Sequence, residues 1–403
     1  MSSSTVSFAL QDLTVHPNAL AAHYSRFRVA ERLLLTGHSH QAWPDCTLEG
    51  QLRAWNDAAE WVDDKWERAF AEADRVREGY RRLLGDPSGY YSLAANTFEL
   101  LVRLMSALPL GQRPRLVTTD SEFHSLRRLL TRLEEEGIEV IRVAAHPAAD
   151  VGERLAASTD NRTAAVLTST VFFNSAQIAG ALSDAAEACR QNGAALVLDA
   201  YHQLNVVPIS LAEAGLEDAF VVGAGYKYCQ LGEGNGFLRF PSPCRLRPVA
   251  TGWFAEFGEL THEPDPSRVQ YQAGHDRFAG ATYDPTSHYR AAEVFRFFQD
   301  HQLDVDFLRQ VSQHQIGLLC RLFDGLDLDP GLIDRDRQIP LQSLGGFLAL
   351  RSPHAEAIWQ GLKEAGVYTD QRADIVRLGP APYLADRQLE ESMHHLGQVV
   401  RAV

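Results

Sequence analysis

The stretch Val221-Val222-Gly223-Ala224-Gly225-Tyr226-Lys227-Tyr228 places a lysine shortly after an apolar run. Small residues separate the run from the lysine, and glycines follow at positions 232, 234 and 236. A short apolar run bounded by glycines predicts a buried strand that ends in a turn. At the carboxyl end of a strand in an open parallel sheet, a side chain faces the place where ligands bind. For Lys227 taken alone, a solvated loop cation is the simpler interpretation.

A second apolar run, Ala195-Leu196-Val197-Leu198-Asp199, ends in a carboxylate. A carboxylate at the end of a buried strand is costly unless a partner neutralises it. A lysine on a small-residue turn together with such an aspartate is what a protein needs to hold pyridoxal 5'-phosphate. The lysine amine binds the aldehyde covalently, and the aspartate keeps the pyridine nitrogen protonated. The sequence therefore predicts that Lys227 and Asp199 hold this cofactor and take part in catalysis.

Short apolar runs alternate with amphipathic stretches between about residues 90 and 240. Continuous apolar strands between helices indicate a parallel sheet that is covered on both faces. This part of the chain is therefore predicted to be an α/β domain with a mainly parallel sheet. The expected strands are Arg115–Thr118, Val140–Val143, Ala164–Thr168, Ala195–Leu198, Phe220–Gly223 and Gly236–Phe240, and the expected helices are Thr97–Ser106, Ser125–Gly137 and Ser183–Asn192.

The two ends of the chain have a different pattern. Apolar residues at helical spacing among many charges predict that Ala54–Leu84 is helical, and a second helical region follows at about Tyr289–Phe323. Later stretches predict strands over 345–350 and 374–378 and a closing helix over 389–403. We expect a large domain over 51–285, a smaller α+β domain over 286–403, and an N-terminal segment, 1–50, that joins the small domain.

Composition excludes several classes of function. The 403 residues carry a net charge of −14, which disfavours nucleic acids and anionic membranes as partners. The five cysteines are scattered without a C-x-x-C motif, which is typical of reduced thiols and indicates neither a disulfide framework nor a metal site. The sequence shows no signal peptide and no apolar run of the roughly 18 residues that a membrane span needs. We expect a soluble, cytoplasmic protein.

Other polar and aromatic residues follow the predicted strands. Asn96-Thr97 opens a helix whose free N–H groups can hold a phosphate, although an ordinary helix cap is the alternative. Phe123 can stack on a pyridine ring, or it can be a core residue. His202 and Tyr226 can reach the cofactor, or they can be structural. Arg377, in an apolar run, indicates either a clamp for a substrate carboxylate or a structural ion pair.

These residues resemble a known family. Asp199-Ala200-Tyr201-His202 with Tyr226-Lys227 downstream looks like the D-x-x-H and Y-K signature of kynureninases, which are fold-type-I pyridoxal-phosphate enzymes of the class V aminotransferase group. The segments 369–372 and 376–382 resemble the family's D-x-R and I-R-x-x-P-A-P ending, in which the second arginine, here Arg377, holds the substrate α-carboxylate. Further matches are similar in order along the chain and are found at 35–39, 96–97, 122–125, 171–177 and 252–254.

The resemblance implies additional roles and a homodimer with shared active sites. His38 and Ser39 would contact the substrate, and Trp253 and Thr282 would reach the phosphate in the neighbouring subunit. Two departures concern the substrate pocket. The family's early asparagine is His38 here, and its S-N-P-P segment is Ala281-Thr282-Tyr283-Asp284-Pro285.

The activity that the resemblance implies is hydrolytic cleavage of the β–γ C–C bond of L-kynurenine, a step of tryptophan catabolism that gives L-alanine and anthranilate. Lys227 would move the α-proton and Tyr226 would deliver a proton. A class V aminotransferase remains open, as does a related β-acyl-alanine substrate. A persulfide-forming desulfurase is disfavoured because no cysteine follows Cys320. A non-catalytic binding protein would have no need for Lys227, Asp199 and Arg377 together.

Overall fold

The structure, a computed structural model, describes residues 7–259 and 267–403, so the first six residues of the predicted N-terminal segment lie outside it. Within the described residues, a seven-stranded sheet has the order β2-β8-β7-β6-β5-β3-β4. All neighbours are parallel except those of β8. The predicted strands are confirmed to within one residue at each end: β3 (Arg115–Thr119), β4 (Glu139–Val143), β5 (Thr163–Ser169), β6 (Ala195–Asp199), β7 (Phe220–Gly223) and β8 (Gly236–Phe240), joined by β2 (Tyr90–Ala94).

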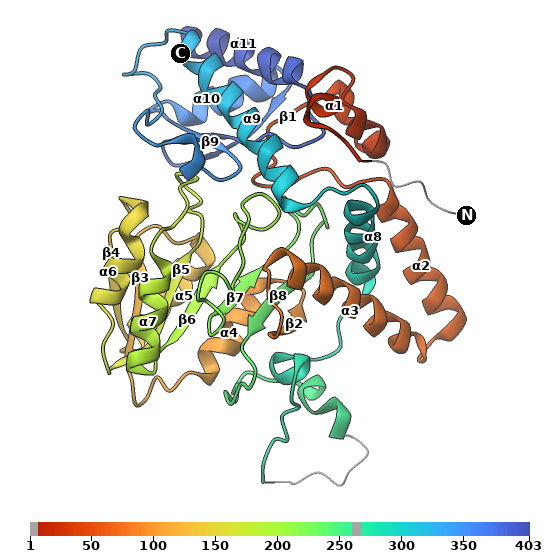
Figure 1. Ribbon diagram of the computed structural model, residues 1–403, viewed down its shortest axis with the longest axis vertical. Coiled ribbons are helices and arrows are strands. Elements are labelled where there is room, and N and C mark those ends of the chain that lie inside the picture. The colour runs from red at the N-terminus through yellow and green to blue at the C-terminus, as the bar shows by residue number, and fades with distance from the viewer. Residues whose placement is uncertain (1–6, 260–266) are drawn as a thin grey trace.

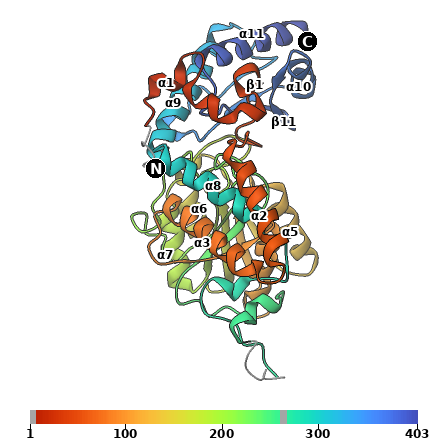
Figure 2. The ribbon, with the colours of Figure 1, turned by 90° about the vertical axis from the view of Figure 1, so that its right-hand side faces the viewer.

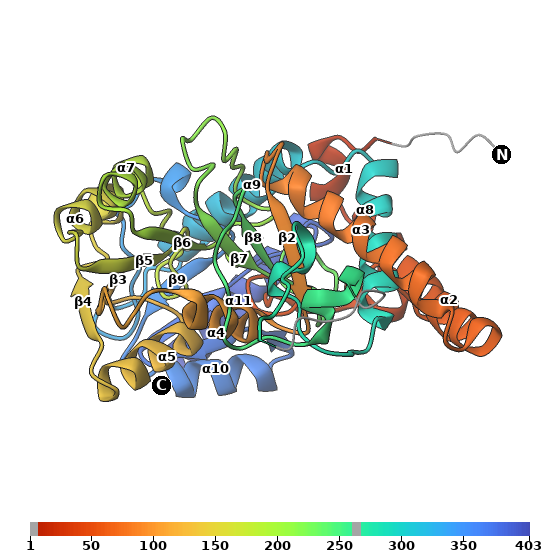
Figure 3. The same cartoon turned by 90° about the horizontal axis from the view of Figure 1, so that it is seen from below.

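Helices cover both faces of this sheet, as its apolar strands require (Figure 3). One face carries α6 (Val151–Ala157) and α7 (Leu182–Asn192), and the other carries α4 (Thr97–Ala107) and α5 (His124–Glu135). Because five of the strands are parallel neighbours, the chain segments that leave their carboxyl ends meet at one edge of the sheet. The predicted α/β class with a mainly parallel sheet is confirmed.

The C-terminal part forms a second, smaller layer above the sheet (Figure 1). An antiparallel sheet of β11 (Asp370–Arg372), β12 (Ile375–Leu378) and β9 (Leu348–Arg351) packs with helices. The N-terminal strand β1 (Leu33–Leu34) pairs in parallel with β10 (Val367–Tyr368), which brings the start of the chain to this part (Figure 2). The helices here are α1 (Leu10–Thr14), α9 (Val305–Gly325), α10 (Ala355–Glu364) and α11 (Asp386–Ala402).

The helical region predicted over Ala54–Leu84 is confirmed, but it is interrupted by a turn. Two helices, α2 (Cys46–Trp61) and α3 (Lys65–Leu83), occupy this region, because the chain turns at Val62 with φ 48° and ψ −97°. The predicted helical region near 289–323 is likewise divided into α8 (Thr286–Asp300) and α9. Short 3-10 helices lie at Ala19–Phe27, Val29–Glu31, Ala148–Asp150, Trp253–Glu259, His275–Phe278 and Leu341–Ser343.

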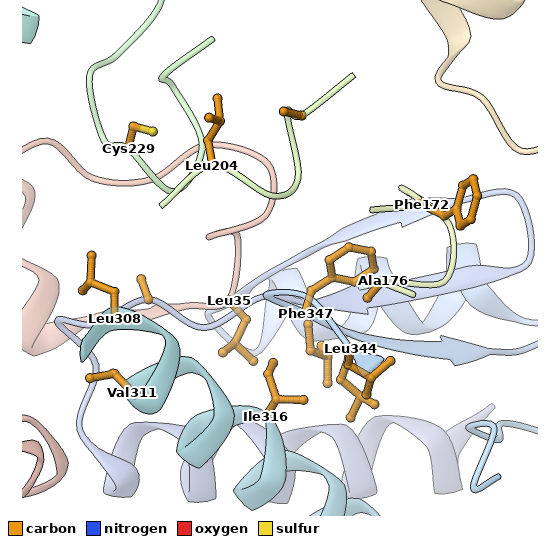
Figure 4. Packing of buried hydrophobic residues seen from close by; sticks show 14 of the residues in the cluster. Leu35, Phe172, Ala176, Leu204, Cys229, Leu308, Val311, Ile316, Leu344 and Phe347 are labelled. Atoms are coloured by element: carbon orange, nitrogen blue, oxygen red, sulfur yellow. The ribbon is translucent and has the colours of Figure 1, made fainter. Parts of the chain in front are cut away.

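The contact between the two parts of the fold positions the site. Figure 4 shows Phe347 beside Ala176, which belongs to the loop that follows β5. The amide of Gly345 donates to the carbonyl of Ala176 at 2.7 Å, and a β-bridge joins Gln177 to Leu344. The loop after β5 is therefore held against the C-terminal part of the fold. Among the described residues, no helix is both long and apolar enough to cross a membrane.

Candidate active site

A cavity of about 280 Å³ lies where the loops after β2, β3, β5, β6 and β7 converge. Its walls come from chain segments that are up to 131 positions apart, since Asn96 and Lys227 both contribute. The structure brings together in this lining most of the residues that the sequence singled out for the cofactor. These are Asn96, Thr97, Phe123, Asp199, His202, Tyr226 and Lys227.

Lys227 is the central residue of the cavity. Its side chain is buried, with 7% exposed, and its Nζ lies 2.7 Å from Nε2 of His202. Burial, followed by the nearby charge of Arg377, lowers the pKa of Lys227 to about 7. Burial also lowers the pKa of His202 well below its ordinary value, so the imidazole is neutral and accepts a hydrogen bond from the amine. The amine is thus oriented and is close to its neutral, nucleophilic form at neutral pH.

Asp199 ends β6 and also lines the cavity. Its Oδ1 accepts a hydrogen bond from the amide of Tyr201 at 3.0 Å. Burial raises the pKa of the Asp199 carboxyl, against the effects of that hydrogen bond and of the Lys227 charge. A buried carboxylate in this position favours a cationic partner, and a protonated pyridine nitrogen is one.

Aromatic rings surround the lysine amine. Nζ of Lys227 lies 5.6 Å from the ring centroid of Phe123, 5.2 Å from that of Tyr201 and 5.9 Å from that of Tyr226. The ring of Phe173 meets Phe123 edge to face, with centroids 5.5 Å apart. A flat heteroaromatic ring fits between such walls.

The start of α4 forms the end of the cavity. Asn96 is the N-cap of this helix, since its Oδ1 accepts from the amide of Glu99 at 3.0 Å. The hydroxyl of Thr97 hydrogen-bonds to Tyr201. The first N–H groups of a helix have no partner within it, and they attract anions such as phosphate. Asn96 therefore has the helix-cap role that the sequence offered as an alternative. Thr97 is the first residue of α4, at the position where an anion such as phosphate would bind.

The predicted substrate residues lie outside the lining of the cavity. Arg377 in β12 is buried and pairs with Asp370, Nε to Oδ1 at 2.8 Å. Its Nη1 donates to the carbonyl of Phe173 at 2.7 Å. His38 contacts Asp370, and Ser39 contacts His40, whose ring stacks on Tyr226 at 4.9 Å. None of the three predicted substrate residues, Arg377, His38 and Ser39, is among the described residues that line the cavity, and Arg377 reaches it only through its contact with Phe173.

Trp253 and Thr282 lie elsewhere. Nε1 of Trp253 donates to Oγ1 of Thr282 at 3.2 Å. Thr282 lines a separate cavity of about 600 Å³, which is also lined by Ala94 and Ala95 at the end of β2. The role of both residues in a neighbouring subunit's site stays a prediction.

Sequence reasoning missed three residues. Tyr201 lines the cavity, and the signal was an aromatic residue two positions after the strand-end aspartate. Glu122 is buried and accepts from the hydroxyls of Thr119 and Ser169, and burial raises its pKa to about 7. Asp370 is the aspartate of the D-x-R segment, but its contact with Arg377 was not predicted.

The residues of the cavity fit pyridoxal phosphate. A buried lysine with a lowered pKa can bind the aldehyde, and a buried carboxylate can hold the ring nitrogen. Nδ1 of His202 is buried without a hydrogen-bond partner among the described residues, so a polar atom of a bound group can supply the missing hydrogen bond.

Comparisons with known proteins agree with this chemistry. Residues 340–396 match the family model of the kynureninase C-terminal domain. The chain is 26% identical to the kynureninase of Geobacillus thermodenitrificans over an alignment of 289 residues. This alignment covers 68% of this chain and 64% of that protein. It is 21% identical over 350 residues to the uncharacterized aminotransferase YcbU of Bacillus subtilis, which covers 85% of this chain and 87% of that protein.

Solved structures share the fold. A mutant of C-DES with glycine covalently linked to its pyridoxal-phosphate cofactor superposes with a TM-score of 0.81 at 15% identity, covering 93% of this chain and 98% of the other. A cysteine desulfurase from Thermococcus onnurineus gives a TM-score of 0.79 at 13% identity, covering 96% of this chain and 98% of the other. The predicted fold type I is confirmed.

Proposed function

Because the chain is a kynureninase-like enzyme of the class V, pyridoxal-phosphate-dependent group, we propose that it is a hydrolase of the kynureninase type. It cleaves the β–γ C–C bond of L-kynurenine, or of a related β-acyl-alanine, to L-alanine and an aryl acid such as anthranilate. The observation that carries this proposal is the ion pair between Asp370 and Arg377, which both lie in the segment that matches the kynureninase family. The charge of Arg377 is close enough to Lys227 to lower the pKa of the lysine.

Each residue of the site has a part in this reaction. Bound pyridoxal phosphate supplies an electron sink for the negative charge that develops on the substrate's α-carbon. Lys227 would hold the cofactor and remove the α-proton, and a pKa of about 7 suits an amine that both accepts and returns a proton. Asp199 keeps the proton on the ring nitrogen. Tyr226 would deliver a proton to the substrate. Water supplies the hydroxyl group of the aryl acid.

The substrate's two ends would meet different surroundings. Arg377 would bind the α-carboxylate, because a guanidinium presents donors to two carboxylate oxygens at once. The aryl group at the other end would lie against Phe173, an aromatic residue of the cavity lining whose carbonyl also binds Arg377.

A persulfide-forming desulfurase is the weaker alternative, although solved desulfurases share the fold. Such an enzyme needs a reactive cysteine at the substrate. All five cysteines lie within the described residues, and none lines the cavity. Burial raises the pKa of the fully buried Cys229, which makes its thiol inert. An aminotransferase remains the second candidate because of the likeness to YcbU.

One experiment separates these reactions. The purified protein, loaded with pyridoxal phosphate, is incubated with L-kynurenine, with 3-hydroxykynurenine, with cystine, and with an amino acid plus a keto acid. A hydrolase gives alanine and the matching aryl acid in equal amounts. An aminotransferase converts the cofactor to its pyridoxamine form instead, and a C–S lyase releases sulfur from cystine. Either of these results without alanine and aryl acid would contradict the proposal.

The assembly belongs to the same proposal. We propose a homodimer in the cytoplasm, acting in tryptophan catabolism, in which Trp253 and Thr282 complete the partner's phosphate site. Their position outside the cavity of their own chain supports this arrangement within the described residues. Mixing an inactive Lys227→Ala chain with an inactive Thr282→Val chain should restore part of the activity, because one mixed site would keep both residues. No recovery in a mixed dimer would contradict the shared site.

A further inference from the structure

Gly379 lies against the imidazole ring of His38, and a side chain at position 379 would clash with that ring. A Cβ on Gly379 would lie 2.1 Å from Nδ1 of His38 and 2.8 Å from its backbone nitrogen. The backbone is held in place on both sides, since the amide of Gly37 donates to Gly379 O at 2.7 Å and the amide of Gly379 donates to Leu35 O at 2.9 Å. His38 is therefore held against β12's end in a fully buried position.

The ring of His38 holds Asp370. Nε2 of His38 lies 2.7 Å from Oδ1 of Asp370. Burial lowers the pKa of His38 to about 4, so the imidazole is neutral at neutral pH. Although burial alone would raise the pKa of Asp370, the hydrogen bonds from His38 and Arg377 and the charge of Arg377 hold it well below its ordinary value. A charged carboxylate only accepts, so Nε2 carries the hydrogen and donates it.

Asp370 contacts two arginines, Arg377 and Arg372. It binds Arg377 with both oxygens, through Nε at 2.8 Å and through Nη2. It also lies 3.2 Å from Nη2 of Arg372, whose side chain is 40% exposed. Oδ1 accepts from both His38 and Arg377, so the histidine fixes the carboxylate in the orientation that serves Arg377.

Arg377 is then held on three sides. Its guanidinium lies over the ring of Phe347 at 5.5 Å, and the same ring lies 4.9 Å from that of His38. Nη1 donates to the carbonyl of Phe173. A guanidinium has five N–H donors, and the contacts among the described residues use three of them. The other two make no hydrogen bond among the described residues, and the contact with Phe173, a residue of the cavity lining, brings the buried guanidinium next to the cavity.

We propose that His38 is a positioning residue for the substrate carboxylate. By donating to Asp370 it fixes the guanidinium of Arg377 with its unused N–H groups toward the substrate. This role rests on the proposed function only in that Arg377 binds an α-carboxylate. It does not depend on which bond of the substrate is cleaved.

The test compares two ligands that differ by a carboxylate. Binding of L-alanine and of ethylamine to the holoenzyme is followed by the change in cofactor absorbance, without turnover. His38→Phe keeps a ring and removes the donor, and it should weaken L-alanine binding about tenfold, the usual effect of losing a hydrogen bond to a charged group. Ethylamine binding should not change. His38→Gln, which keeps a donor near the position of Nε2, should recover part of the loss.

Two further variants make the test decisive. His314→Phe is the matched control, because it removes a His–Asp contact of 2.8 Å to Asp386 in the same domain, and it should leave both ligands unaffected. Asp370→Asn keeps the shape and removes the charge, so it should reproduce the selective loss if His38→Phe does not fold. Equal effects on both ligands, or no effect in a folded variant, would overturn the proposal. So would a wild-type enzyme that does not prefer L-alanine. If kynurenine is not cleaved but this preference holds, only the proposed hydrolase activity fails.

Discussion

Nζ of Lys227 lies 2.7 Å from Nε2 of His202, and both side chains are buried. Burial disfavours the charged form of each, so the pKa of the lysine falls to about 7 and the pKa of the histidine falls well below its ordinary value. A neutral imidazole accepts one hydrogen of the amine and fixes its direction. The lysine is therefore ready to react near neutral pH, which a solvated lysine is not.

This pKa predicts how the apoenzyme captures its cofactor. The neutral amine is the reactive form, and it dominates above the pKa, so the rate of covalent binding of pyridoxal phosphate should rise as the pH passes about 7 and level off far below the ordinary 10.5. The measurement is the growth of the protein-bound cofactor absorbance after mixing. In Arg377→Met the transition should move to higher pH, because burial and then the Arg377 charge are the main causes of the lowered pKa. A transition near 10.5 in the wild type would contradict the expectation.

The site of attachment has a direct test, because the chain contains only three lysines, Lys65, Lys227 and Lys363. Lys227→Ala should abolish turnover and the absorbance of covalently held cofactor. Reduction with borohydride and peptide mapping should place the cofactor on Lys227 in the wild type. Lys363→Ala, on the surface of α10, is the matched control and should behave as wild type. A labelled peptide around either other lysine would refute the assignment.

Asp199→Asn should separate cofactor binding from catalysis. The amide cannot keep the pyridine nitrogen protonated, so we expect kcat to fall by about a hundredfold or more while the cofactor stays attached. The control is Asp120→Asn, which changes another aspartate that follows a strand of the sheet. Oδ1 of Asp120 accepts from the amide of Ala145 at 2.9 Å and has a structural role, so the activity should persist. Comparable losses in the two variants would show that Asp199 has no special role.

The strands could be predicted because each is a continuous apolar run, and the polar residues at their ends then had to converge. The break between α2 and α3 could not, because Val62-Asp63-Asp64 contains neither glycine nor proline and the turn is stabilised only in the folded chain. The pairing of His38 with Asp370 was equally hidden. The two residues are 332 positions apart, and no local pattern marks either as a partner of the other.

The same distinction between local pattern and long-range pairing applies to the buried ion pair of Asp86 and Arg239. Both side chains are 1% exposed, and Nε of Arg239 donates to Oδ2 of Asp86 at 2.9 Å. The pair joins the turn after α3 to β8 of the central sheet. Arg239→Leu would leave a buried carboxylate without its partner, which costs about 3–5 kcal/mol. Urea unfolding at neutral pH should show a loss of this size in the free energy of unfolding.

The pH dependence of this stability follows from the pKa of Asp86. Although burial alone would raise it, the hydrogen bonds and the charge of Arg239 lower it to about 2, compared with 3.8 in the unfolded chain. A lowered pKa in the folded state adds stability above pH 3.8 that is lost as the pH falls toward 2. This contribution should be missing in Arg239→Leu, so the variant should lose less stability than the wild type over that range.

Arg132→Gln breaks an exposed pair with Glu136 and should change the stability by less than about 1 kcal/mol. If the two variants unfolded at the same urea concentration, the buried pair would have no such role.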